Sequence, residues 1–338
     1  MTTPNAARLC ATVSLCLVAW QARADPTEYP LMIENCGETV TFDAAPRNAV
    51  ALGQNSAEIL LLLGLEDSIA ATAFWPNQVL PELAEANEGV ELLTVEFPSL
   101  ESVLAQEPDL VAAQLPTLLG PDSRVAKRED LHGLGIPTYL SPSACTTVQD
   151  GGDAYGSRED LWSMELMYQE IDELSRIFDV ADRGQAVIAD FRAREAALRE
   201  RFAENGDLTF VFWFSSPSPS DDAYLGGGNG PSGYIADILG GRNAIETEAE
   251  WPTVGWEAIM AADPTVFVVA QVDRNRWDLD TAANKIDFLR SDPAVSQMPA
   301  VSADRIVEMR GAAMNPSIQT LYGAEEIAKA LEDMSLPR

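Results

Sequence analysis

The stretch ADRGQAVIADFRAREAALRERFA, residues 181–203, decides the architecture that we predict for this chain. Its apolar residues recur close to the 3.6-residue period of an α-helix, with arginines and glutamates between them. No proline interrupts the stretch, so the pattern predicts one helix, about 33 Å long at 1.5 Å per residue. Such a helix could be an ordinary surface helix or a rigid spacer between two lobes, and the flanking sequence decides between these interpretations.

Strand and helix patterns alternate on both sides of this stretch. Short buried strands are predicted at 48–52, 69–72, 110–113, 137–140, 208–212, 266–269 and 306–308. Helices are predicted at 57–65 with Ser56 as its N-cap, at 100–107 with Ser99 as its N-cap, and at 160–178, 232–239, 256–262 and 325–333. Strands that alternate with helices indicate βαβ units and mostly parallel sheets.

An internal repeat relates the two halves of the chain. The segment ESVLAQEPDLV at 101–111 matches EAIMAADPTVF at 257–267, and each copy is a helix that a proline ends before a buried strand. The repeat predicts two doubly wound α/β lobes, 25–180 and 205–338, with 181–204 as a linker helix. Because ligands of open α/β sheets bind beyond the carboxyl ends of the strands, we expect a ligand cleft between the lobes.

The N-terminus has the features of a secretory signal peptide at 1–24. Arg8 precedes an apolar run at 9–20, and Ala22-Arg23-Ala24 fits a cleavage site before Asp25. The mature chain would then contain two cysteines, Cys36 and Cys145. In an oxidising compartment this predicts one disulfide, with two free buried thiols as the alternative.

The charge and the composition exclude several classes of function. Without the signal peptide the chain carries 20 basic and 53 acidic residues, a net charge of −33, which argues against a nucleic-acid partner. His132 is the only histidine, so a usual zinc or manganese site is excluded, and we predict neither a metal site nor a cofactor. The segment GNGPSG at 228–233 fits a dinucleotide motif formally, but Pro231 interrupts it and no clear strand precedes it. No nucleophile elbow accompanies His132, so we do not expect an enzyme.

Four segments carry a resemblance to a known family: AVAL (49–52) with AEILLLLGL (57–65), LESVLAQEPDLV (100–111), GGRN (240–243) and WPTVGWEAIMAADP (251–264). In this order and spacing the chain resembles the periplasmic substrate-binding proteins of ABC importers for ferric siderophores, haem or vitamin B12. The resemblance runs from about Cys36 to the end of the chain. It implies two α/β lobes joined by one long helix, with small hinge motion.

The resemblance also implies a function. We expect a periplasmic, monomeric, non-enzymatic protein that captures an iron–siderophore complex and delivers it to an inner-membrane ABC permease with its ATPase. A cobalamin or haem binder of the same importer class is the alternative. Glu101 and Glu257 match the lobe-tip glutamates that pair with arginines of the permease, although both could be ordinary solvated helix residues.

The same resemblance predicts the residues of the ligand site. Positions that line the site in the family are matched by Trp75, Gln114, Phe214, Trp251 and Arg310. We expect Trp213 and Tyr224 to flank the mouth of the cleft, with core packing as the alternative for each aromatic residue. Arg274 and Arg276 could neutralise an anionic ferric chelate or could lie in a solvated loop.

Overall fold

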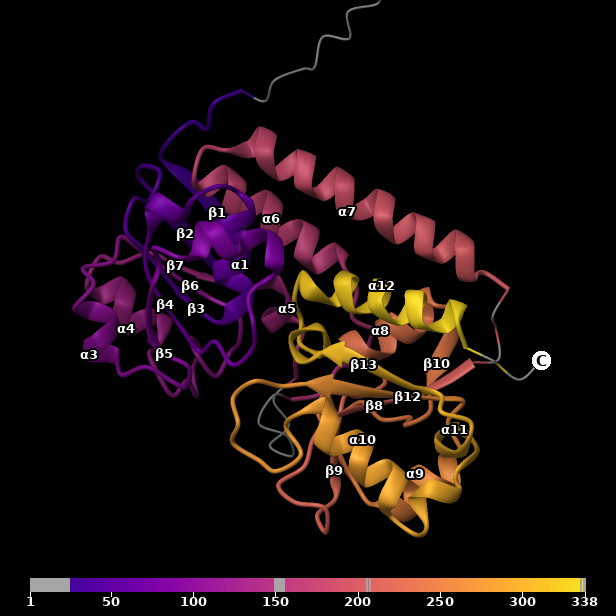
Figure 1. Cartoon of the computed structure of the whole chain (residues 1–338). Helices are drawn as coiled ribbons and strands as arrows, with labels where there is room; N and C mark the ends of the chain where they lie inside the picture. Colours follow the sequence, from indigo (N-terminus) through magenta and orange to yellow (C-terminus); the bar gives the residue numbers. More distant parts are fainter. Residues whose placement is uncertain (1–24, 149–155, 205, 207, 335, 337–338) are drawn as a thin grey trace, which may run out of the picture.

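The computed structural model describes residues 25–148, 156–204, 206, 208–334 and 336, so the predicted signal peptide lies outside the described residues. Two α/β lobes lie side by side, and the long helix α7 (Ala181–Phe202) crosses from one to the other (Figure 1). The predicted fold class, two α/β lobes with mostly parallel sheets joined by one long helix, is confirmed. The domain boundaries at 180 and 204 stay a prediction.

The N-terminal lobe contains a five-stranded, fully parallel sheet in the order β5-β4-β3-β6-β7. Its strands are β3 (Ala49–Leu52), β4 (Ile69–Ala73), β5 (Glu91–Thr94), β6 (Leu110–Ala113) and β7 (Thr138–Leu140). Its helices are α1 (Gln54–Leu62), α2 (Ala84–Asn87), α3 (Leu100–Leu104), α4 (Arg128–Gly133), α5 (Pro142–Cys145) and α6 (Glu165–Ile177), with short 3₁₀ turns η1 (Glu66–Ser68) and η2 (Pro81–Leu83). The central strands β3 and β6 are apolar and fully buried because helices cover both faces of the sheet.

The C-terminal lobe contains a six-stranded sheet in the order β11-β9-β8-β12-β13, with β10 paired to β8. Its strands are β8 (Leu208–Ser215), β9 (Ala223–Leu225), β10 (Gly241–Asn243), β11 (Thr253–Val254), β12 (Val266–Gln271) and β13 (Ile306–Arg310). Strand β9 runs antiparallel to both of its neighbours, β8 and β11, and the pairs β8–β10, β8–β12 and β12–β13 are parallel. Its helices are α8 (Pro231–Ile238), α9 (Trp256–Ala262), α10 (Ala282–Ser291), α11 (Pro299–Ser302) and α12 (Gln319–Glu332), with 3₁₀ turns η3 (Val295–Gln297) and η4 (Gly311–Met314).

Hydrogen bonds and ion pairs connect helix α7 to both lobes. Near its start, the Arg183 guanidinium donates to the carbonyl oxygens of Leu63 at 2.7 Å and of Gly64 at 2.9 Å, at the end of α1. In its second half, Arg194 pairs with Glu325 of α12 at 2.8 Å. One continuous apolar core, which includes residues of α1, α6, α7 and α12, extends through both lobes. These contacts favour the spacer interpretation of the stretch at 181–203 over an ordinary surface helix.

Several predicted boundaries differ from the structure. The helix predicted to begin after Ser56 begins at Gln54, and Ser56 lies fully buried within its first turn. Its N-cap is Gly53, whose φ of 105° is strained for residues other than glycine. The helix predicted at 160–178 begins only at Glu165. The prediction of the N-cap Ser99 is confirmed, since its Oγ accepts a hydrogen bond from the Ser102 N–H at 3.1 Å.

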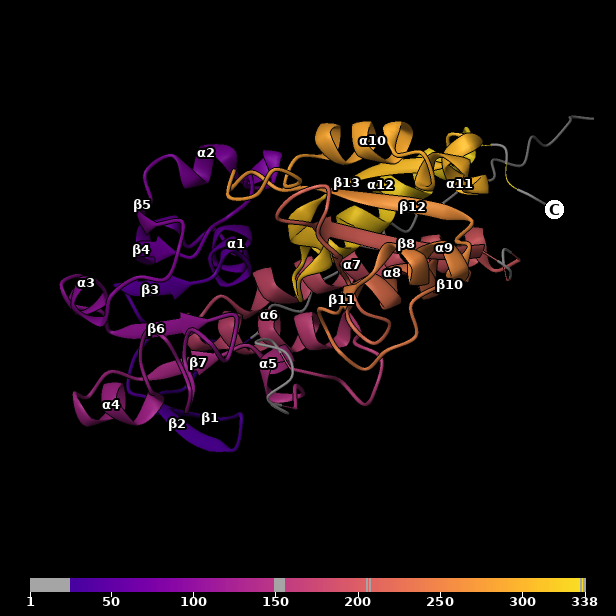
Figure 2. The ribbon, with the colours of Figure 1, turned by 90° about the horizontal axis from the view of Figure 1, so that it is seen from below.

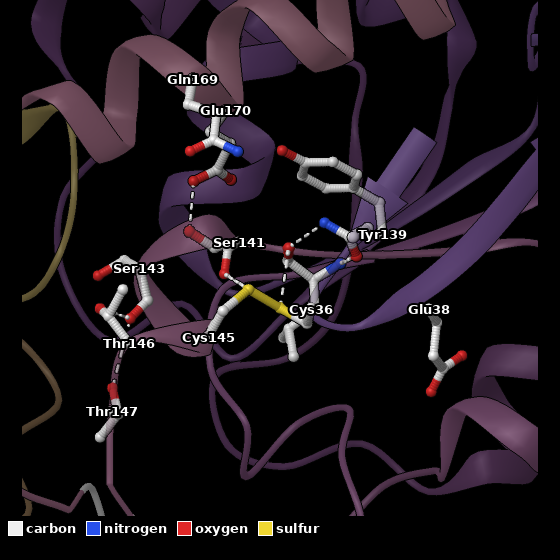
Figure 3. The surroundings of a disulfide bond; sticks show 12 residues. Cys36, Glu38, Tyr139, Ser141, Ser143, Cys145, Thr146, Thr147, Gln169 and Glu170 are labelled. Carbon is white, nitrogen blue, oxygen red and sulfur yellow. Dashed lines mark hydrogen bonds between the residues drawn. A yellow bond between two sulfur atoms is a disulfide. The ribbon is translucent and has the colours of Figure 1, made fainter. Parts of the chain in front are cut away.

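An N-terminal hairpin of β1 (Leu31–Asn35) and β2 (Glu38–Phe42) was not predicted. The predicted disulfide between Cys36 and Cys145 is present, with the two Cα atoms 5.1 Å apart, and it ties this hairpin to α5 (Figure 3). The Asn35 side chain reinforces the link, because it donates to the Leu140 carbonyl and accepts from the Leu140 N–H, each at 2.8 Å. The hairpin is therefore fixed covalently and by hydrogen bonds next to β7.

Candidate ligand-binding cleft

A narrow cavity of about 60 Å³ lies between the two lobes, where parallel strands of both sheets end. Figure 2 shows the two sheets side by side, with α6 and α7 crossing between the lobes. The N-terminal lobe lines the cavity with Gln54, Asn55, Glu58, Phe74, Asn77 and Gln114. The C-terminal lobe lines it with Phe214, Tyr224, Trp251, Arg274, Asn315 and Ser317.

Three aromatic side chains form one side of the cavity, and we call Phe214, Tyr224 and Trp251 the aromatic wall. Tyr224 and Trp251 stack with ring centroids 5.4 Å apart and an interplanar angle of 20°. Phe214 packs edge-on against Trp251 at 4.8 Å. The antiparallel pairing of β9 with β8 and β11 brings these rings together from distant parts of the sequence. Such a wall offers a large contact area with little side-chain entropy to lose.

Polar side chains of the N-terminal lobe form the floor and bond directly to the C-terminal lobe. Gln114 Nε2 donates to the Pro316 carbonyl oxygen at 3.0 Å. Asn55 Oδ1 accepts from the Ile318 N–H at 2.8 Å. These bonds hold the lobes together at the base of the cleft. Gln114 also accepts from the Asn55 N–H at 3.1 Å, so it takes over the capping role predicted for Ser56.

A buried carboxyl group, Glu58, completes the contact between the lobes. Gln319 Nε2 of α12 donates to both of its oxygens, at 2.7 and 2.9 Å. Burial raises the pKa of Glu58 to about 7, although hydrogen bonds from Gln319, Gln54 and the Leu80 N–H and the charge of Arg310 offset part of the effect. The sequence pattern did not predict Glu58 as a site residue, because it lies within a run of buried apolar residues.

A second buried carboxyl group, Glu170 of α6, lies behind the floor. It accepts hydrogen bonds from Ser141 Oγ at 2.5 Å, drawn in Figure 3, and from Asn55 Nδ2 at 3.2 Å. Burial raises its pKa to about 8, so the group is largely protonated at neutral pH. Asn55 therefore links this protonated acid to the backbone of the other lobe.

Arg274 is the one cationic side chain among the described residues that line the cavity. Its Nη2 lies 3.1 Å from Asp280 Oδ1. Asp280 is buried and also accepts from Ser215 Oγ at 2.6 Å. Burial alone would raise the pKa of Asp280, but hydrogen bonds from Ser215, Arg274 and the Trp277 N–H hold it below its usual value.

The structure brings together part of the predicted ligand site. Gln114, Phe214, Tyr224, Trp251 and Arg274 line the cavity, and their role in ligand binding stays a prediction.

The remaining predicted residues lie elsewhere. Trp213 is fully buried against Trp256 and Phe288, with ring centroids 4.9 and 5.7 Å away. Since successive side chains of a strand point to opposite faces, Phe214 at the cavity places Trp213 in the core on the far side. Trp75 is also a core residue, and its neighbour Phe74, which has a φ of 59°, lines the cavity instead.

The two other predicted arginines also lie outside the residues that line the cavity. Arg310 forms an ion pair with Glu326 of α12, so its charge is balanced. Arg276 is exposed, with its guanidinium carbon 5.7 Å from the Trp277 ring, which fits the solvated-loop alternative.

The two glutamates predicted to dock on a permease occupy equivalent places in the lobes. Glu101 and Glu257 are both exposed, and each lies in the first turn of its helix, α3 or α9. In Figure 1, α7 runs along the top, and α3 and α9 lie toward the opposite side of their lobes. A carboxylate in the first turn also interacts favourably with the helix dipole, which is the purely structural explanation for these residues.

In the described part of the chain, no group of three or more His, Cys, Asp or Glu side chains is placed to hold a metal ion. No helix in the described ranges combines the length and the apolar character needed to span a membrane.

Two lobes, a connecting helix and a cavity between the sheets define a binding protein of the two-lobe type. The family model of the periplasmic binding proteins matches residues 50–313, and the chain belongs to this family. The family resemblance seen in the sequence is thereby confirmed. Members of this family are exported solute-binding proteins of ABC importers rather than enzymes.

The chain is also similar to individual proteins, one by sequence and two by fold. The vitamin B12-binding protein of Vibrio campbellii is 27% identical over 224 residues, which cover 66% of this chain and 70% of that protein. A periplasmic binding protein from Veillonella parvula superposes with a TM-score of 0.73 at 20% identity, over 90% of this chain and 98% of the other. A structure described as an ABC-type Fe3+-hydroxamate transport system from Saccharomonospora viridis superposes with a TM-score of 0.70 at 24% identity. The superposition covers 90% of this chain and 99% of the other.

Proposed function

We propose that this protein captures an iron–siderophore complex in the cleft between its lobes and delivers it to an inner-membrane ABC permease with its ATPase. The observation that carries the proposal is the aromatic wall of Phe214, Tyr224 and Trp251 opposite a floor of amide side chains. A bulky chelate has apolar surface for the wall and oxygen or nitrogen atoms for the floor.

Entry of a chelate requires movement, because a cavity of about 60 Å³ is far smaller than the pockets of roughly 300–1,000 Å³ that hold small-molecule ligands. The bonds of Gln114 to Pro316, Asn55 to Ile318 and Glu58 to Gln319 oppose wide separation of the lobes. A small displacement of the lobes, together with new rotamers of the aromatic wall, fits these constraints. The continuous core through both lobes also favours a small motion.

Cobalamin is the second candidate ligand. The observation that favours it is the sequence similarity of 27% to a vitamin B12-binding protein. The amides at the edge of a corrin ring could also exchange hydrogen bonds with Gln54, Asn55 and Asn77. Haem is less favoured, because Tyr224 is the only described residue lining the cavity of a type that commonly ligates haem iron.

Delivery to a permease would use the exposed glutamates Glu101 and Glu257, one on each lobe. Two carboxylates at fixed spacing would set the register of docking against arginines of the partner. This role rests on the family resemblance and on the equivalent positions of the two residues.

A tryptophan-fluorescence titration of the mature chain tests the proposal. The panel contains a ferric hydroxamate, a ferric catecholate, ferric citrate, haem and cobalamin, with controls for dilution and absorbance. Saturable quenching by a ferric chelate is the expected result, since Trp251 lies in the aromatic wall. Saturation by cobalamin alone would favour the second candidate. No binding across the panel, checked by calorimetry, would contradict the proposal.

A further inference from the structure

We infer that the ion pair of Arg274 and Asp280 selects a chelate of low net charge, because it offers the ligand a hydrogen-bond donor whose positive charge is already balanced. The inference names the charge class of the ligand and rests on the function proposed above. Four observations support the inference. They are the contacts that fix Arg274, the hydrogen bonds that Asp280 accepts, the protonation of Lys285 behind them, and the other charges of the cavity.

Arg274 is fixed in place without any ligand. Its Nε and Nη2 donate to Asp280, at distances of 3.1 to 3.3 Å. Its guanidinium carbon lies 4.6 Å from the Trp277 ring centroid and 5.4 Å from that of Phe214. Nη1 makes no hydrogen bond to any residue in the described part of the chain, so this nitrogen stays available to a ligand oxygen.

Asp280 is held independently of Arg274. Its side chain is 1% exposed and accepts from Ser215 Oγ at 2.6 Å. The backbone N–H groups of Arg276 and Trp277 donate to Oδ2 at 2.7 and 2.9 Å. These donors favour the ionised form, and the pKa of Asp280 lies below its usual value. The carboxylate therefore balances the guanidinium before a ligand arrives.

Lys285 of α10 lies fully buried behind this pair. Its Nζ donates to the carbonyl oxygens of Ala270 and Asp280, each at 2.7 Å. Burial lowers the pKa of Lys285 to about 7, and at pH 8 most of the side chain is uncharged. At that pH Lys285 connects α10 to the loop that carries Arg274, and it adds little positive charge.

Among the described residues that line the cavity, Glu58 is the other charged group and it does not attract anions, whereas Arg276 lies outside the lining and is exposed to solvent. Glu58 has a pKa raised by burial to about 7, so it is mostly negative at pH 8. Arg310 is paired with Glu326. A polyanionic chelate would thus lose its hydration without an uncompensated cation to replace it, which is unfavourable. A neutral chelate needs only the donor and the aromatic wall.

The first test uses the unmodified mature chain at pH 8. Calorimetry compares ferrichrome, a neutral ferric trihydroxamate, with a polyanionic ferric tris-catecholate. We expect ferrichrome to bind at least about tenfold more tightly. Tighter binding of the tris-catecholate would overturn the inference and leave the proposed function intact. If neither chelate binds, and ferric citrate does not bind in the fluorescence panel, the proposed capture of an iron–siderophore complex itself fails and the inference falls with it.

The second test frees the guanidinium. D280N keeps the shape of the side chain but removes its charge, and we expect the affinity ratio of tris-catecholate to ferrichrome to rise about tenfold. The matched control is D304N, which breaks an exposed ion pair of the same lobe, that of Arg290 with Asp304 at 2.7 Å. An unchanged ratio in folded D280N, or an equal rise in D304N, would contradict the inference. If D280N does not fold, the double variant R274Q/D280N should bind ferrichrome about tenfold less tightly, because the guanidinium donor is lost, and an unchanged affinity for ferrichrome would contradict the inference.

Discussion

The two lobes have related strand–helix topologies but line the cavity with different chemistry. The N-terminal lobe contributes mainly the amides and the carboxyl group of α1 and the loops after β4 and β6, whereas the C-terminal lobe contributes the aromatic wall and Arg274. Several of the N-terminal polar groups are already bonded to the opposite lobe. The comparison indicates a division of roles, in which the N-terminal side holds the lobes together and the C-terminal side recognises the ligand.

The sheets explain part of this difference. In the N-terminal lobe α1 follows β3 after one glycine, so its first turn, with Gln54 and Asn55, lies at the strand end. In the C-terminal lobe β8 continues to Ser215 and pairs with the antiparallel strand β9, so side chains of the sheet itself reach the cavity. A helix N-terminus presents polar groups and N–H donors, whereas extended strands present large side chains.

The largest expected effect is on the stability of the N-terminal lobe, which the disulfide crosses. C36S/C145S removes a cross-link between residues 109 positions apart, and we expect a loss of about 5 kcal/mol in the free energy of unfolding, by the loop-entropy model. Urea unfolding with and without reductant measures it. Ligand affinity, measured where the variant is folded, should not change. If the free energy of unfolding falls by less than about 1 kcal/mol, hydrogen bonds suffice to hold the hairpin without the disulfide, and the prediction is wrong.

The contact between the lobes should depend on pH through Glu58. Its folded-state pKa of about 7 lies above the ordinary 4.5, so its contribution to stability is fully present below pH 4.5 and is lost as the pH rises through 7. At 1.36 kcal/mol per pKa unit, the loss approaches about 3 kcal/mol by pH 8. In E58Q, the decrease of the unfolding free energy between pH 5 and 8 should be smaller than in the unmodified chain by most of this amount. E66Q, at an exposed position, is the control, and an E58Q profile parallel to that of the unmodified chain would refute the prediction.

A smaller loss of stability is expected from G53A at the start of α1. A Cβ atom there would lie 2.6 Å from Gln114 Cβ, and the φ of 105° is unfavourable for alanine. We expect a loss of about 2 kcal/mol and a weaker contact of Gln114 with Pro316. Denaturant unfolding measures it, with G133A as the control, because a Cβ at Gly133 meets nothing within 4 Å. Equal stability of the two variants would show that the polar floor adapts easily.

The smallest effect on ligand affinity is expected at the exposed glutamates. E101A and E257A should each leave the affinity for the chelate unchanged, because neither residue lines the cavity. Each should weaken docking by about 1 kcal/mol, measured as stimulation of the permease ATPase in reconstituted vesicles. E200A, which removes an exposed glutamate of α7, is the control. A loss of ligand affinity in E101A or E257A would contradict the docking role.

Local patterns predicted the architecture well. The repeat around Glu101 and Glu257, the apolar runs of β3 and β6 and the helix at 181–203 each depend on a few neighbouring residues. The two cysteines of the mature chain also left one possible pair, which the structure contains. Elements without a strong local pattern, such as β9 and β11, were missed because their pairing depends on distant residues.

The site was predicted only in part, for physical reasons that single residues illustrate. Trp213 and Phe214 are adjacent aromatics, and only the register of β8 decides which one faces the cavity. The pairing of Arg310 with Glu326 depends on the packing of α12 against β13, which no local pattern reports. In the sequence, Asn55 and Glu58 are isolated polar residues in an apolar helix. Their role becomes visible only in the folded chain, where each bonds to a residue of the opposite lobe.

The most direct measurement of the division of roles compares one variant from each side. Calorimetric titration with ferrichrome and urea unfolding are performed on Y224A, from the aromatic wall, and on N55A, from the polar floor. We expect Y224A to weaken binding about tenfold with a small change in stability. We expect N55A to lose about 1 to 3 kcal/mol of stability, since the buried Ile318 N–H loses its partner, with affinity changed less than threefold. The reverse pattern, a binding defect in N55A and a stability defect in Y224A, would contradict the division of roles between the lobes.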